Sequence, residues 1–296
     1  SDNMNMVAVL GHFDSYVSDF VAPVYEHAGL LMIAPSSMNT GVMLDSDFDL
    51  VFQAAPGRKE LGRAVADYLA AAGLDKIIVY SHFLDMASNT ADVFENQAFE
   101  AGLDVVDRKS YSTGYRVTPW DKDLKFWKES YHFDAFFITG RPEYAADFTI
   151  YARNTGVTAP VAGTLNMDSS KILKRRGHPV ENLVIPTLFH PQVHASGEFK
   201  KFKSRFKDKF GQDPDAWAVR GYDSLMLLAH AVRSAESTVP AEMSRALKTM
   251  PAYQGINGKM DFDSSGKMKG RPIYFKKAVN GRFEYLDHVF RPNQEE

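Results

Sequence analysis

The chain has 296 residues, of which 45% are hydrophobic, and a formal net charge of −3. This length favours two compact lobes over one, and the small mixed charge gives no reason to expect binding to nucleic acid or an anionic membrane surface. Cysteine is absent, which excludes disulfides, thiolate metal sites and a cysteine nucleophile. No apolar run reaches the roughly 20 residues that span a bilayer, and no basic segment precedes an apolar one at the amino terminus, so we expect a soluble chain whose signal peptide has been removed.

Strand-like and helix-like segments alternate along most of the chain, which predicts parallel sheets covered by helices. The first group predicts a strand at 7–10, a helix at 17–28, a strand at 30–34 and an extended run at 49–54. This group ends at Pro56-Gly57, a strong break.

A second group follows the break and begins with an amphipathic helix at 60–72, with Gly73 at the C-cap position. The other elements expected here are helices at 91–101, 122–129 and 145–154 and strands at 76–80, 134–140, 160–163 and 183–186, with one more beginning at 105–106.

The last third changes character. Helices are expected at 197–210, 215–234 and 240–250, followed by short strands at 259–262, 272–278 and 282–286 with turns at 263–266 and 280–281. The second of these turns is Asn280-Gly281, a strong hairpin signal. The predicted fold class is therefore α/β, a doubly wound body that ends in an antiparallel meander.

Two of the expected strands end in small, hydroxyl-rich turns. The first runs into His12-Phe13-Asp14-Ser15, and the strand at 30–34 runs into Pro35-Ser36-Ser37. Ligands of open α/β sheets bind beyond the carboxyl ends of the strands. Ser15, Ser36 and Ser37 are therefore candidates for contact with a small polar ligand.

Several short motifs occur in a characteristic order between residues 7 and 286. They are Gly11-His12-Phe13-Asp14-Ser15, Ala34-Pro35-Ser36-Ser37 with Asn39, Phe52 to Pro56, Gly140 with Pro142-Glu143, Asp213-Pro214-Asp215-Ala216, Gly221-Tyr222-Asp223, and Phe262-Asp263 with Gly266. In this order they resemble the periplasmic solute-binding proteins of ABC importers, of the branched-chain amino acid (Leu/Ile/Val) receptor type. Each motif is weak alone, and the shared order is what makes the resemblance specific.

The resemblance implies the type I periplasmic binding fold, which has two Rossmann-like lobes connected by three chain crossings. The first lobe would comprise 1–55 and 190–252, the second 56–189 and 259–296, with 253–258 as a crossover. A ligand would sit between the lobes, and hinge closure around it would be the functional event.

The resemblance also implies a periplasmic or otherwise extracytoplasmic receptor with no catalytic activity and no cofactor. Its partners would be a small-molecule ligand, either an amino acid or an organic acid, and the membrane permease of an ABC importer. Neither nucleic acid binding nor direct membrane insertion is expected.

Receptors of this type usually begin with a strand, a helix and a second strand before the segment that corresponds to Val7. Without them, we expect two unpaired strand edges and apolar helix faces in the first lobe. The alternatives are a fragment, a truncated or cleaved chain, a partner chain that supplies the strand, and a short variant with rearranged pairing.

In the resembled family, the residue at the position of Ser15 binds a ligand carboxylate, and the next turn contributes backbone groups and a threonine hydroxyl. Hydroxyl and amide donors beside helix N-termini suit a carboxylate. The other role open to Ser15 is to cap the helix expected to start at Val17. Met38 stands where the family carries the threonine, so one side-chain contact with an amino acid's head group is lost.

The second lobe departs further, at the positions where the family has a tyrosine, an acid that pairs with the ligand ammonium, and a loop aromatic. The residues here are Arg141, Thr164 or Leu165, and Asp85 or Met86 with Phe83 nearby.

These changes alter the expected ligand. A buried ammonium without a carboxylate partner is costly, whereas arginine offers a planar fork that matches a carboxylate. We therefore expect a small organic acid rather than an ordinary α-amino acid, and Phe13, Phe83 and Tyr111 would suit an aromatic one. The alternative for Arg141 is a solvated charge paired with Glu143 or Asp147.

Other chemistry has little support in the sequence. His190 and His194 are four residues apart, but Pro191 disfavours a helix between them, so no metal site is expected. Nucleotide-binding glycine loops and Gly-x-Ser-x-Gly are missing. Trp120, in Thr118-Pro119-Trp120, is expected in an exposed loop.

Two other functions stay open. The first is the ligand-binding sensory ectodomain of a signalling protein, which would share the fold and the cleft. The second and less favoured is an enzyme on a doubly wound fold. It would have to rely on His12, Asp14 and Ser15, which lie too close along one turn to aim at one another easily.

Overall fold

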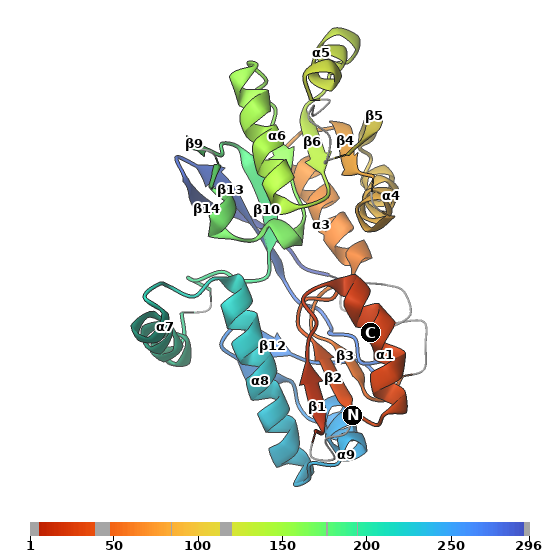
Figure 1. Ribbon diagram of the computed structural model, residues 1–296, viewed down its shortest axis with the longest axis vertical. Coiled ribbons are helices and arrows are strands. Elements are labelled where there is room, and N and C mark those ends of the chain that lie inside the picture. Colours follow the sequence, from red (N-terminus) through yellow and green to blue (C-terminus); the bar gives the residue numbers. More distant parts are fainter. Residues whose placement is uncertain are drawn as a thin grey trace. The chain divides into compact units, whose positions relative to one another are not determined.

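The computed structural model describes residues 6–38, 48–83, 85–112, 120–175, 177–193 and 195–292, without the side chains of 85–87. Internal contacts divide the chain into two compact units. The first comprises Ser1–Arg58, Leu188–Pro272 and Arg291–Glu296, and the second Lys59–Thr187 and Ile273–Phe290. Figure 1 shows that both consist of a sheet flanked by helices, so the predicted α/β class is confirmed.

The first unit contains a sheet of three parallel strands in the order β1-β2-β3. These are β1 (Ala8–Leu10), β2 (Leu31–Ala34) and β3 (Val51–Gln53). The central strand β2 is buried along its whole length because helices cover both faces of the sheet. Its uninterrupted apolar sequence, Leu-Met-Ile-Ala, is typical of a parallel strand buried on both faces.

Figure 1 shows these helices on the two sides of the sheet. On one side α1 (Ser15–His27) packs its small residue Ala22 against Met32 and Val51. The opposite side is covered by α8 (Ala216–Ala235) and α9 (Pro240–Thr249), which contribute Leu227 and Met243 to a second cluster. A third cluster joins α7 (Gly197–Phe210) to the start of α8.

The segment between α9 and residue 272 belongs to the first unit. Its strands β11 (Tyr253–Gly255) and β12 (Gly258–Met260) form a separate two-stranded hairpin. The following turn joins the edge of β3, because Gln53 N donates to Gly266 O at 2.8 Å and Met268 N donates to Gln53 O at 3.1 Å. We expected 259–272 in the second lobe. The pattern of short strands predicts a meander but not the sheet edge to which each strand adds.

The edges of this sheet differ from each other. Among the residues that the structure describes, β1 pairs with β2 alone, so one open edge is present as expected. The β3 edge takes the turn through a bridge between Gln53 and Lys267.

The second unit contains a seven-stranded sheet in the order β14-β13-β10-β7-β6-β4-β5. Its parallel strands are β4 (Lys76–His82), β5 (Asp104–Tyr111), β6 (Ala135–Ile138), β7 (Val161–Ala162) and β10 (Leu183–Thr187). The antiparallel strands are β13 (Ile273–Val279) and β14 (Arg282–Phe290). Asn280 and Gly281 connect these two with positive φ angles of 51° and 73°, which confirms the predicted two-residue hairpin.

Helices cover both faces of this sheet as well. On one face α3 (Arg58–Ala71) and α4 (Asp85–Glu100) pack, and the ring of Phe94 stacks 3.7 Å from that of Phe137. On the other face α5 (Trp120–Ser130) and α6 (Pro142–Asn154) contribute to an extended apolar cluster. Short elements follow β7: η1 (Leu165–Met167), η2 (Ser170–Ile172) and the hairpin of β8 (Lys174–Arg175) with β9 (His178–Pro179).

Two sequence-based expectations about these helices are wrong. Trp120 does not lie in an exposed loop: it is the first residue of α5, and its side chain is buried in the apolar cluster. α6 begins at Pro142 rather than at residue 145, because proline suits the first helical turn, where its missing N–H needs no partner. Within the described ranges, no helix combines the length and apolar character needed to cross a membrane.

Candidate functional site

The turns after β1 and β2 are joined by hydrogen bonds from side chains that the sequence singled out. Met38 N donates to Ser15 Oγ at 3.1 Å. Ser36 Oγ lies 2.8 Å from the carbonyl oxygen of His12 and 3.0 Å from that of Phe13, to which it donates. Ser15, Ser36 and Ser37 are all buried. The structure thus brings these residues together, and the bonds of Ser15 and Ser36 join one turn to the other.

Ser15 does not cap α1, so the capping role considered for it is wrong. The helix begins at Ser15, and the cap is Asp14, whose backbone is extended and whose Oδ1 accepts from Tyr16 N at 2.9 Å. An Asp in the N-cap position reaches the free N–H groups of the first turn. Ser15 Oγ instead accepts from a backbone N–H of the neighbouring turn.

A buried arginine beside these turns was missed by the sequence analysis. Arg220 of α8 is only 4% exposed, and it donates from Nη2 to the carbonyl oxygen of Pro35. Its guanidinium lies 4.7 Å from the ring of Trp217, which in turn lies 4.8 Å from the exposed ring of Phe13. The available signal was the spacing of Trp217 and Arg220, three residues apart on the first turns of a helix.

Charges of both signs lie in this part of the first unit. The amino-terminal end of α1 carries partial positive charge that the Asp14 carboxylate at the N-cap offsets, and Arg220 adds a full positive charge. Met38 is partly buried with its N–H bonded to Ser15, and Asn39 lies outside the described residues.

In the second unit, the carboxyl ends of β4 and β6 carry an aromatic cluster. His82 is the last residue of β4, and its ring lies 4.9 Å from that of Phe83. It also lies 6.0 Å from the ring of Tyr144, with 10° between the two planes. Tyr111 completes the cluster, with its hydroxyl donating to the carbonyl oxygen of Thr139 at 2.6 Å. His82 and Tyr144 were not predicted, because the expected strand stopped two residues before His82 and the expected helix began one residue after Tyr144.

Gly140 allows the backbone to pass close to this cluster. It has a φ of 122°, and a Cβ atom here would lie 2.5 Å from Tyr111 Oη and 2.9 Å from His82 Cβ. Only glycine therefore fits. Arg141 follows directly, so the close approach at Gly140 carries Arg141 to the edge of the aromatic cluster.

Arg141 is exposed and occupies the N-cap position of α6, where its side chain makes no capping hydrogen bond. The alternative pairing with Glu143 or Asp147 is not observed. Asp147 pairs instead with Arg175, at 3.2 Å from both Nε and Nη2. Among the described residues, Arg141 has no ion pair. The helix dipole disfavours a cation at a helix N-terminus. An anion bound here would offset the charge of the Arg141 guanidinium and the partial positive charge of the helix end.

The other predicted residues of the second unit separate into two groups. Thr164 hydrogen bonds to the side chain of Asn166, which donates to Gly140 O at 3.0 Å, so Thr164 lies near the aromatic cluster. Leu165 is buried, and its predicted contact with a ligand stays a prediction. Asp85 is the first residue of α4, and its side chain and that of Met86 lie outside the described part of the structure.

Burial lowers the pKa of His82, and the nearby charge of Arg141 lowers it further. The imidazole is therefore neutral near pH 7, when both effects oppose its protonation. Of these two neighbouring side chains, Arg141 therefore carries the positive charge.

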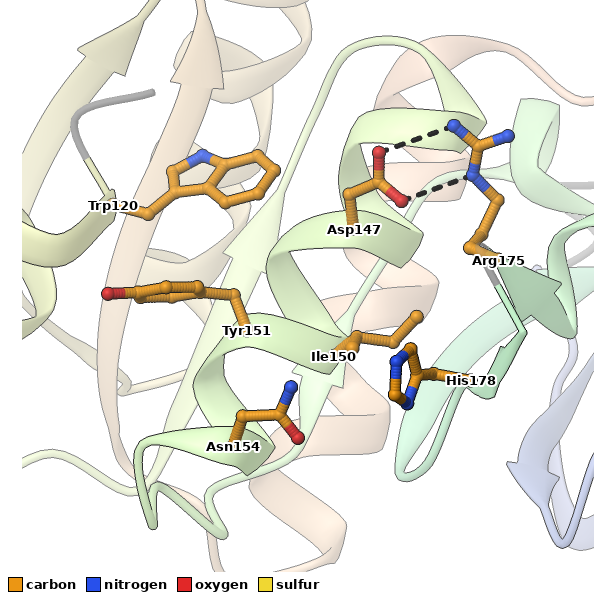
Figure 2. Close-up of a pocket in the computed structure, with 7 residues that line it drawn as sticks. All are labelled: Trp120, Asp147, Ile150, Tyr151, Asn154, Arg175 and His178. Carbon is orange, nitrogen blue, oxygen red and sulfur yellow. Dashed lines mark hydrogen bonds and ion pairs between the residues drawn. The ribbon is translucent and has the colours of Figure 1, made fainter. Parts of the chain in front are cut away.

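A separate cavity of about 210 Å³ lies along the outer face of α6 (Figure 2). The ion pair of Asp147 with Arg175 closes one side of it, as the dashed lines in Figure 2 show. The residues that line it are Trp120, Asp147, Ile150, Tyr151, Asn154, Arg175 and His178. None of them belongs to the predicted ligand site, so this cavity and the predicted residues do not coincide.

The described residues contain no group of three His, Cys, Asp or Glu side chains placed to hold a metal ion. His190 Nδ1 accepts from the backbone N–H groups of Gln192 and Val193, and His194 lies outside the described residues. The ring of His12 lies 3.1 Å from the hydroxyl of Tyr25. His12 and His190 therefore make local contacts within the fold.

Comparisons with solved structures agree with this architecture. The ABC transporter substrate-binding protein from Desulfitobacterium hafniense, solved in complex with Leu, is 28% identical, with a TM-score of 0.82 over 96% of this chain and 82% of that one. A solute-binding protein from R. palustris, solved in complex with benzoate, is 17% identical, with a TM-score of 0.78 over 94% of this chain and 76% of that one. This second likeness concerns the fold alone.

Comparisons of sequence identify the family. The Leu/Ile/Val-binding protein homolog 1 of Brucella melitensis is 22% identical over 291 residues, which cover 94% of this chain and 74% of that protein. Residues 2–282 match the family described as periplasmic binding protein. Because this match extends over nearly the whole sequence, the chain belongs to the periplasmic binding protein family.

Proposed function

We propose that this protein is an extracytoplasmic solute receptor that captures a small carboxylate-bearing molecule and delivers it unchanged to the permease of an ABC importer. Membership of the periplasmic binding protein family supports the receptor role. The relatives named above include ABC transporter substrate-binding proteins, one solved with leucine and one with benzoate. These names support a small acid as the class of ligand.

Arg141 is the observation that carries the preference for a carboxylate. It is an exposed guanidinium at a helix N-terminus without an ion pair among the described residues. Its planar fork matches a carboxylate. The aromatic residues beside it, His82, Phe83 and Tyr144, provide no carboxylate for a ligand ammonium.

The same aromatic residues favour a ligand with a ring. Phe83 is exposed, and aromatic side chains gain from packing against a ring in offset or edge-on geometry. An aromatic acid such as benzoate would use both the guanidinium and this apolar surface. Leucine would bring an ammonium group, for which the described side chains of this aromatic cluster provide no carboxylate partner.

The first unit supports an anionic ligand independently. Arg220 lies at the turn that contains Pro35, and the ring of Phe13 is exposed next to Trp217. The hydroxyls of Ser15 and Ser36 are engaged within the protein. We therefore assign them to shaping the turns, and we assign the charge to Arg220.

The test is calorimetric titration of the purified chain with benzoate and with leucine. We expect benzoate to bind more tightly, and Arg141→Ala to weaken its binding about 10- to 100-fold, since a charged hydrogen bond contributes about 1.5–3 kcal/mol. The matched control is Arg282→Ala, because Arg282 is an exposed arginine on β14 of the same unit that pairs with Glu284. Equal affinities for the two compounds, or unchanged benzoate binding in Arg141→Ala, would contradict the proposal.

Recovery of the ligand tests the absence of turnover. Benzoate incubated with the protein should be recovered chemically unchanged when analysed by mass spectrometry. Conversion to any product would assign the chain to an enzyme instead.

A further inference from the structure

Helix α7 is attached to the first unit through its first two turns. Phe199 is buried, and its ring lies 5.1 Å from that of Phe189. The ring of Phe202 lies 4.5 Å from that of Tyr222 on α8. In Figure 1 α7 lies apart from the three-stranded sheet of this unit, on the far side of α8. The last two turns of α7 lie outside the apolar cluster that these four residues share.

The aromatic stripe of α7 continues from the attached turns into solvent. Phe206 and Phe210 follow Phe199 and Phe202 at helical spacing, so all four lie on one side of the helix. The rings of Phe206 and Phe210 lie 4.5 Å apart. Phe206 is partly buried and Phe210 is 56% exposed. Two rings present far less apolar area than a stable protein interface buries, so they would have to act together with charge.

Basic side chains flank this stripe on both sides. Helix α7 has six basic and two acidic residues, a net charge of +4, and because the whole chain carries −3, the remaining residues together carry −7. On a helical projection Lys203 and Lys207 lie on one side of Phe206. Arg205 and Lys209 lie on its other side. The small net charge of the chain therefore conceals a concentration of positive charge on one helix.

The cations of α7 are only partly matched by acids. Three of them pair with exposed carboxylates, namely Lys201, Lys203 and Lys207. Exposed pairs of this kind contribute little to stability. The other three are exposed and make no ion pair in the part of the chain that the structure describes: Lys200, Arg205 and Lys209. Like charges on one helix repel one another, so a negatively charged surface against α7 would be attracted.

Rings between two rows of cations favour an anionic lipid surface. A helix of this kind lies along a bilayer, with its rings at the boundary between headgroups and acyl chains and its cations near the phosphates. A second copy of α7 would set like charges against one another. Nucleic acid would satisfy the charges, but Phe206 and Phe210 leave no room for a base between their rings.

We propose that the last two turns of α7 form a docking surface for anionic lipid, which holds the receptor reversibly against a membrane. The proposal rests on the proposed extracytoplasmic role, which places the protein beside a bilayer that contains its permease. Phe206 and Phe210 contact the headgroup boundary, and Arg205 and Lys209 reach lipid phosphates. Each cation near such a surface strengthens binding about fivefold. The helix lies on the bilayer and does not cross it.

The first experiment measures co-sedimentation of the full chain with vesicles of phosphatidylglycerol and phosphatidylcholine in equal parts, and of phosphatidylcholine alone. We expect binding to the anionic vesicles, lost as salt rises from about 50 to 500 mM, because salt screens the charges. Arg205→Ala with Lys209→Ala should weaken binding about 25-fold. The matched control is Arg245→Ala with Lys259→Ala, an exposed arginine and an exposed lysine of the same unit, which should leave binding unchanged.

The second experiment tests the apolar contact. Phe210→Ser should weaken binding to the anionic vesicles roughly 10-fold, since a ring that enters the bilayer is removed from water. Phe99→Ser on α4 is the control, because Phe99 is 83% exposed, and it should bind as wild type does. Circular dichroism of each variant confirms that it is folded.

Three results would overturn the proposal: no binding to the anionic vesicles, equal loss in the Arg245 and Lys259 control, or binding that Phe210→Ser leaves unchanged. The last of these would assign α7 to soluble polyanions instead of lipid. Calorimetric titration with benzoate does not depend on α7. A chain that binds benzoate but no vesicles therefore overturns the lipid surface alone, and a chain that binds vesicles but no small acid overturns the proposed function alone.

Discussion

The two units of this protein arrange similar elements with different degrees of enclosure. The second unit covers a seven-stranded sheet with helices on both faces and buries an ion pair between Lys276 and Asp168. The first unit has a main sheet of three strands, an open edge at β1 among the described residues and exposed apolar side chains on α1. Two units built from a helix-flanked sheet can therefore differ in which strand edges and helix faces they expose to solvent.

The largest effect is expected from the buried ion pair, where the second unit is most enclosed. Thr187 donates to Asp168 Oδ2 at 2.5 Å, and the other carboxylate oxygen meets Lys276. Asp168→Ala should lower the free energy of unfolding by about 3–5 kcal/mol, because it leaves a buried ammonium without its partner. Urea denaturation measures this. The double variant Asp168→Ala with Lys276→Met should recover much of the lost stability. If Asp168→Ala alone were as stable as wild type, the ion pair would not be buried.

The first unit depends on a different kind of buried acid. Asp223 of α8 accepts from the N–H groups of Ile256 at 2.8 Å and Asn257 at 2.9 Å, and so holds the β11–β12 turn. Asp223→Ala leaves both donors unpaired and should cost about 2–3 kcal/mol. Asp223→Asn, which keeps one acceptor, should cost less.

Hydrogen exchange of the backbone amides, measured at increasing denaturant concentration, shows which unit Asp223→Ala destabilises. Loss of protection is expected in β1, β2 and α8 before the second unit opens. Asp208→Ala on the exposed surface of α7 is the control and should change stability by less than about 0.5 kcal/mol. Equal loss of protection in both units would show that they unfold together, and the contrast between them would then not extend to stability.

The smallest expected effect is the pH dependence of stability that His82, in the aromatic cluster of the second unit, contributes. The pKa of His82 is lowered by burial and by Arg141, so the folded state binds fewer protons there than the unfolded state. The stabilisation from this group is fully present above the ordinary histidine pKa of about 6.5 and is lost as the pH falls toward the lowered value. Melting temperatures of wild type and His82→Gln between pH 8 and pH 5 should therefore diverge above pH 6.5 and converge at lower pH.

The same histidine reports on the ligand. A carboxylate bound at Arg141 would offset the positive charge that lowers the pKa of His82, so the pKa should rise when benzoate is added. Titration of the His82 ring signals by NMR measures this shift, with His132 in the same unit as an exposed reference. An unchanged pKa in the saturated protein would place the ligand away from Arg141.

The sequence was most informative where local chemistry decides the structure. Asn280-Gly281 predicted a two-residue hairpin, because few other residues adopt positive φ at two adjacent positions. The ends of β1 and β2 were predicted from runs of apolar residues that stop in hydroxyl-rich turns, and Ser15 and Ser36 do lie together there. Arg141 was recognised as unusual because it stands at a strand end where the resembled family has a tyrosine.

Other residues of the candidate site depend on contacts between distant segments. Arg220 reaches the carbonyl of Pro35, 185 residues earlier in the chain, and no local pattern predicts that contact. His82 belongs to the site only because Gly140 lets the backbone after β6 approach it. The segment 263–268 adds to β3 rather than to the large sheet, since any open strand edge offers the same backbone groups.

The amino-acid sequence by itself determined the alternation of strands and helices, the α/β class and the family, because these follow from apolar periodicity, turn chemistry and the order of short motifs. Only the tertiary structure decided which cation lies beside the turns of the first unit, which aromatic rings surround Arg141 and which face of α1 is left without a cover. The physical reason is that burial and electrostatics depend on distances through space, whereas periodicity and turn preferences act between neighbours along the chain.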